Sequence, residues 1–167
     1  MGMKIKVALP LILSLFWSFG EGVQAYSDKH LTLNFPKGWS ENKNMFGMDV
    51  IFMSAHVAGK TPLMVLGSTY EKKIAPSEAL KFVDKGLVEE YGKDKLRILD
   101  KGVLKGEAVS IYFATGKVVR KGTSEKVFTA LIPRESKYHH FLFQAPAASF
   151  DKSLPLVKNS LKNIKLK

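Results

Sequence analysis

The chain has 167 residues, 46% of them hydrophobic and 25% charged, a composition that excludes intrinsic disorder and suits a single globular domain. It contains no cysteine, so we expect a fold without disulfides and without a cysteine-linked lipid anchor. The formal net charge of +11 attracts anionic surfaces, such as phospholipid headgroups, lipopolysaccharide or acidic proteins, but the lysines are scattered and a soluble basic surface is the favoured interpretation over a dedicated anion-binding face.

Residues 1–25 have the three-part pattern of a secretory signal peptide. Two lysines precede an apolar run over residues 7–19, and Val23-Gln24-Ala25 places small residues where a signal peptidase cleaves. We therefore expect cleavage near Ala25 and one periplasmic or secreted domain over residues 26–167. An uncleaved membrane anchor is the alternative, but this run is shorter than the roughly 20 apolar residues that span a bilayer.

The first part of the predicted domain is rich in strands. Residues 31–35 alternate apolar and polar side chains, which predicts the opening strand of a sheet, ended by Pro36. Trp39 follows a tight turn and is expected to pack over the edge of the core. Residues 40–47 are polar and are expected to form a loop. Two more apolar strands are expected over residues 48–57 and 63–70.

A helix is predicted to begin at Ser77, as the N-cap, and to end at Gly92. Between these ends, apolar residues recur at helical spacing along one stripe. Beyond the helix, strand-like runs are separated by breaks too short for crossover helices, which indicates antiparallel hairpins. These runs cover residues 96–99, 108–118, 126–132 and 138–144.

A second helix is predicted from about Asp151 or Ser153 to Lys165, with Pro155 in its first turn. The predicted order is three strands, a helix, four strands and a helix. It indicates an α+β protein in which helices pack on one antiparallel sheet.

Four local features carry a resemblance to a known family. They are the strand running into Pro36-Lys37-Gly38-Trp39, the helix headed by Ser77, the long strands from Val127 to Phe143, and Phe150 about ten residues before Ser160-Leu161. The layout resembles the PsbP-like fold, which is shared by the extrinsic PsbP proteins of photosystem II, the Ran-binding Mog-type proteins and the DcrB-like exported proteins.

The resemblance covers residues 26–167 and implies a central antiparallel sheet of about six or seven strands, flanked by helices as an α/β/α sandwich. Known members of the family mostly act without catalysis, as binding, assembly or chaperone-like modules. The family has no catalytic motif to carry over, so the resemblance gives no residue a role.

The residues themselves also contain no complete catalytic motif. Gly59-Lys60-Thr61 has the end of a phosphate-binding loop, but Ser54 stands where the loop requires glycine and Pro62 follows where a helix should begin. We therefore expect no catalytic residue and no cofactor, and interpret the protein as non-enzymatic.

Metal binding is a less favoured alternative. His139 and His140 are adjacent in a predicted strand, so their side chains should point to opposite faces and not chelate one ion. A second group of side chains offers a soft site for cuprous copper as a further alternative, against the ordinary role of methionine as a core residue. That group comprises Met45, Met48, Met53, Met64 and His56.

The favoured interpretation is an exported, non-catalytic binding or assembly module that acts on an unknown protein or cell-envelope partner. The alternative is a basic peripheral binder of anionic membrane or lipopolysaccharide surfaces. Its expected contact is the outer face of the closing helix, with Lys158, Lys162, Lys165 and Lys167. Nucleic acid is not expected as a partner, because the signal directs export.

Overall fold

The structure is a computed structural model that describes residues 25–27, 31–35, 38–54, 62–120 and 122–167. The predicted signal peptide, apart from Ala25, lies outside these residues. Among the described helices, none is long and apolar enough to cross a membrane.

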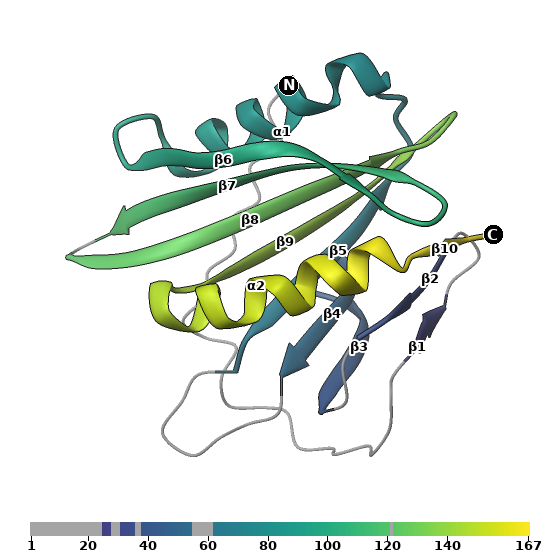
Figure 1. Cartoon of the computed structure of the whole chain (residues 1–167), viewed down its shortest axis with the longest axis horizontal. Helices are drawn as coiled ribbons and strands as arrows, with labels where there is room; N and C mark the ends of the chain where they lie inside the picture. Colours follow the sequence, from purple (N-terminus) through teal and green to yellow (C-terminus); the bar gives the residue numbers. More distant parts are fainter. Residues whose placement is uncertain (1–24, 28–30, 36–37, 55–61, 121) are drawn as a thin grey trace.

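A sheet of seven antiparallel strands runs through the molecule in the order β3-β4-β5-β9-β8-β7-β6 (Figure 1). Its strands are β3 (Trp39–Met45), β4 (Met48–Ser54), β5 (Met64–Tyr70), β6 (Leu96–Lys105), β7 (Ser110–Arg120), β8 (Thr123–Pro133) and β9 (Tyr138–Pro146). The helices are α1 (Pro76–Tyr91) and α2 (Ala147–Lys162). A second, three-stranded sheet contains β1 (Ala25–Ser27), β2 (Leu31–Asn34) and β10 (Lys165–Leu166). The predicted α+β class is confirmed.

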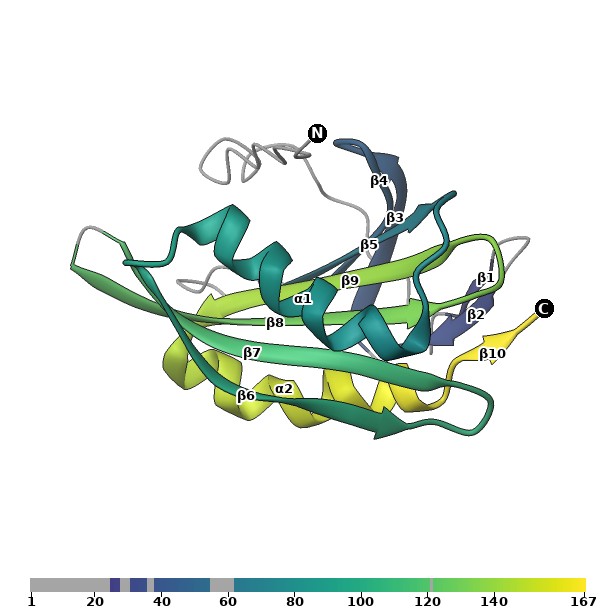
Figure 2. The same cartoon turned by 90° about the horizontal axis from the view of Figure 1, so that it is seen from above.

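The two helices cover opposite faces of the large sheet (Figure 2). On the α1 side, Ala79, Val83, Leu87 and Tyr91 of the helix pack with Ala114, Val118, Val127 and Leu131 of the strands. On the α2 side, Phe150, Val157 and Leu161 pack with Phe113, Phe128 and Phe143. This division into two apolar layers gives the α/β/α sandwich that the resemblance implies.

The opening strand β2 does not join the large sheet, contrary to the prediction. It pairs with β1 on one side and β10 on the other, and its apolar residues enter the core on the α2 side. Phe35 stacks on Phe52 of β4 with ring centres 4.0 Å apart, and lies 5.2 Å from Trp39. Trp39 is only 7% exposed, which confirms its predicted place in the core.

The predicted loop over residues 40–47 is wrong, because most of it forms β3. This strand pairs with β4 from Trp39 to Lys43 and again at Met45, and the two are joined at Phe46 and Gly47, both with positive φ (53° and 76°). That turn matches the twist of a hairpin. A polar sequence is compatible with this strand because β3 lies at the edge of the sheet. There, main-chain hydrogen bonds to β4 stabilise it without burial of most of its side chains.

Both helices begin earlier than predicted. Ala75, not Ser77, is the N-cap of α1 and makes no side-chain capping bond, and Pro76 opens the helix with its fixed φ. Helix α2 begins at Ala147, so Pro155 lies inside it and not in its first turn. Helix α2 also ends at Lys162, and Lys165 belongs to β10.

Gly67 and Gly86 allow a test of the packing between strands. A Cβ atom at Gly67 would lie 2.8 Å from Cγ1 of Val50 and 3.0 Å from Cε1 of Phe141, whereas one at Gly86 would meet nothing within 4 Å. Gly67→Ala should lower the free energy of unfolding by about 1–3 kcal/mol through overpacking. Gly86→Ala, on the exposed side of α1, should raise it by about 1 kcal/mol. Chemical denaturation measures both changes, and equal effects at the two positions would contradict the packing described.

Candidate functional site

The predicted contact lysines do not share one outer helix face. Lys158 is half-buried, and its Nζ lies over two core rings, 4.3 Å from the centre of Phe113 and 5.8 Å from that of Phe128. Such a cation–π arrangement holds the ammonium group against the sheet. The predicted outward position of Lys158 is therefore wrong.

The other three lysines lie at the C-terminal end of the chain. Lys162 is exposed at the last residue of α2, and its carbonyl oxygen accepts a hydrogen bond from the N–H of Glu107 (3.1 Å). Lys165 pairs with Thr32 in the small sheet, and Lys167 follows β10. Figure 1 shows this end of α2 far from the end of β7. Contact of these lysines with an anionic surface stays a prediction.

A different group of cations comes together on the large sheet. Arg97 of β6 lies directly opposite Lys117 of β7, and Lys117 lies directly opposite Lys126 of β8. Neighbouring strands are about 4.8 Å apart, so the three side chains stand side by side. We call Arg97, Lys117 and Lys126 the cationic row.

The cationic row belongs to the α2 side of the sheet. Lys126 forms an ion pair with Asp151 of α2, with Nζ and Oδ2 2.7 Å apart. Phe128, two residues further along β8, is in the core beneath α2. Arg97 and Lys117 are exposed, and within the described part of the chain no ion pair is found for either. Two of the three cations are therefore available to a partner.

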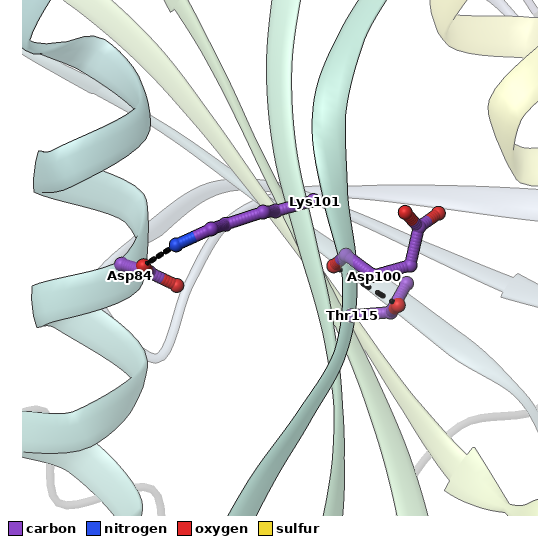
Figure 3. Close-up of polar contacts among 4 residues, drawn as sticks. All are labelled: Asp84, Asp100, Lys101 and Thr115. Carbon is purple, nitrogen blue, oxygen red and sulfur yellow. Dashed lines mark hydrogen bonds and ion pairs between the residues drawn. The ribbon is translucent and has the colours of Figure 1, made fainter.

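The acidic residues near the row are few. Asp100 lies on the α2 side, where its carbonyl oxygen accepts a hydrogen bond from the hydroxyl of Thr115 (3.3 Å). The next residue, Lys101, points to the other side of β6 and pairs with Asp84 of α1 (Figure 3). Lys101 is thus neutralised on the α1 side, and Asp100 and Asp151 are the carboxylates placed near the row.

The histidines take structural hydrogen bonds on opposite faces of β9, as predicted. Nδ1 of His139 lies 2.9 Å from Oγ1 of Thr69, and Nε2 of His140 lies 2.6 Å from Oγ1 of Thr129. Burial lowers the pKa of His140 to about 4, so this ring is neutral at pH 7. Among the described residues, no group of three His, Asp or Glu side chains is placed to hold a metal ion.

The methionines form two separate pairs and not one soft cluster. Met53 lies opposite Met64, and Met45 lies opposite Met48 at the other end of β4. Met48 and Met53 are five positions apart along β4, which is about 16 Å of strand. The sulfur of Met48 accepts a hydrogen bond from the Ser68 hydroxyl (3.2 Å). His56, the remaining member of the predicted copper group, lies outside the described residues.

Burial also shifts the pKa values of two tyrosines on the α1 side of the sheet. The rings of Tyr70 and Tyr138 stack with their centres 4.9 Å apart. Burial, and secondarily Tyr70, raises the pKa of Tyr138 to about 12, and burial also raises the pKa of Tyr70. Both phenols are therefore neutral at physiological pH, which suits packing and not proton transfer.

The histidine shift predicts a pH dependence of stability. The unfolded chain keeps a pKa near 6.5 for His140, so it binds more protons than the folded state between about pH 6.5 and about pH 4. Stability should fall across this window as the pH drops, by up to about 3 kcal/mol from this residue. The His140→Gln variant lacks the titrating ring, so its free energy of unfolding should fall less between neutral pH and about pH 4.5 than that of the unchanged protein, as measured by chemical denaturation. Equal losses in both proteins would contradict the assignment.

Comparison with solved structures identifies the fold. CyanoP, the cyanobacterial PsbP of Synechocystis sp. PCC 6803, matches with a TM-score of 0.64 at 13% identity, over 93% of this chain and 99% of its own. LpqN of Mycobacterium tuberculosis matches with a TM-score of 0.66 at 12% identity, over 89% of this chain and 91% of its own. PA94 of Pseudomonas aeruginosa, whose function is unknown, matches with a TM-score of 0.54 at 15% identity, over 84% of this chain and 94% of its own. No family model and no curated protein matches the sequence. The chain has the PsbP-like fold.

Proposed function

We propose that this protein is an exported, non-catalytic binding module that acts on a protein or cell-envelope partner, and that the cationic row is its contact. The row itself carries the proposal. Like charges directly opposite one another destabilise a sheet, so the exposed pair of Arg97 and Lys117, which no ion pair among the described residues compensates, favours a function that uses it. A bound anionic partner would relieve the repulsion between Arg97 and Lys117.

Export and fold support the envelope as the place of action. The pattern over residues 1–25 predicts a signal peptide cleaved near Ala25, which would deliver residues 26–167 to the periplasm or the medium. LpqN, which shares the fold, is involved in cell envelope biogenesis in its own organism. We extend this place of action, and not a particular partner, to the present chain.

The non-catalytic part of the proposal comes from the titratable groups. Acid–base catalysis favours a pKa near the working pH. The pKa values of His140 and Tyr138 are instead moved away from neutrality by burial. Both side chains also belong to packed layers of the sheet, where they stabilise the fold.

Site-specific photo-crosslinking in the native host tests the contact face. A photo-reactive residue at Val119, which is 52% exposed two residues beyond Lys117 on the same face, should give adducts with an envelope component. The same residue at Val88, which is 38% exposed on α1, is the matched control and should give few. Arg97→Gln with Lys117→Gln should reduce the Val119 adducts. Equal labelling at both positions, or turnover of a small substrate by the purified protein, would contradict the proposal.

A further inference from the structure

We propose that the exposed part of the α2 side of β6 and β7, around Arg97, Lys117 and Val119, docks on an anionic phospholipid bilayer, with Arg97 and Lys117 against the lipid phosphates. The inference rests on the proposed function and narrows its partner to one class. It is carried by the geometry of the row, by the apolar residue beside it and by the distribution of charge on this face.

The row suits a planar partner. Arg97 and Lys117 are exposed and lie directly opposite each other on adjacent strands about 4.8 Å apart. Their long apolar stems let the charged ends adjust to anions at varied positions. A lipid surface offers phosphates at any register, whereas an acidic protein would need carboxylates matched to this spacing.

An exposed apolar residue lies within the cationic face. Val119 follows Lys117 by two residues in β7, so it lies on the same side of the sheet, and it is 52% exposed. Basic residues with an apolar neighbour are the combination that peripheral proteins present to a membrane interface. The attraction comes from the cations, at about a fivefold gain in partition for each one near an anionic surface.

The remaining charges decide which residues to test. Asp151 neutralises Lys126, and Lys158 is held against the rings of Phe113 and Phe128. Lys158 therefore adds positive potential to the face without reaching outward. Within the cationic row, Arg97 and Lys117 are the two cations free to contact phosphates, so their removal should have the largest effect.

Vesicle co-sedimentation of the purified protein tests the inference. The protein should bind phosphatidylcholine vesicles that contain phosphatidylglycerol and not vesicles of phosphatidylcholine alone, and added salt should weaken binding. The double variant R97Q/K117Q should bind about 25-fold more weakly, at about fivefold for each cation lost.

Two matched variants remove the same net charge elsewhere. K81Q/K85Q changes two exposed lysines of α1, on the opposite side of the sheet, and K165Q/K167Q changes the C-terminal pair. Both should bind within about twofold of the unchanged protein, because charges beyond a Debye length of the surface are screened. Circular dichroism of each variant shows whether the fold is kept.

Several results would overturn the inference. One is that the unchanged protein does not bind anionic vesicles at low salt. The others are that K81Q/K85Q loses as much vesicle affinity as R97Q/K117Q, or that K165Q/K167Q loses more. Displacement from vesicles by inorganic phosphate at matched ionic strength would indicate a small-anion site and likewise overturn the docking surface. If vesicles are not bound but Val119 still cross-links to one protein in cells, the lipid inference fails and the proposed function stands.

Discussion

The antiparallel register of the β7–β8 hairpin is the constraint on which the rest of the structure depends. Arg120 pairs with Thr123, so two residues join the strands, and the second, Gly122, has a φ of 79° that favours glycine. This turn sets every later pair in the hairpin, including Lys117 with Lys126. A slip of one residue would move the core side chains of one strand to the wrong face. The core beneath α2 and the cationic row therefore have the same origin.

Much of the fold could be predicted from the sequence because its strands alternate or are continuously apolar. Six of the seven strands of the large sheet, the two helices and the buried Trp39 follow from such patterns. The edge strand β3 does not, because main-chain pairing with β4 stabilises a polar sequence that reads as a loop. The separate pairing of β2 could not be predicted either, since its partner β10 is a two-residue strand without a pattern of its own.

The candidate site was less accessible to sequence reasoning. Lys117 and Lys126 lie at equal distances from the turn at Lys121-Gly122, so the hairpin signal alone could have paired them. Arg97 could not be added in this way, because the register of β6 shifts within the strand. Helical spacing predicts an outer position for Lys158, because it locates a side chain around the helix but does not show how far the neighbouring sheet extends beside it.

The shift in β6 explains how an edge strand can carry charges for two faces. The register slips between Ile98 and Asp100, so that Asp100 lies on the α2 side and Lys101 on the α1 side. Without the slip, strand alternation would turn the Asp100 side chain toward Asp84 of α1. Lys101 would then point to the α2 side and could not pair with Asp84. With the bulge, Lys101 forms an ion pair with Asp84 in place of a repulsion between two carboxylates. Arg97 precedes the slip and stays opposite Lys117 in the cationic row. A bulge and a central lysine also protect a long edge strand from pairing with other chains, so β6 presents its charges without recruiting a second sheet.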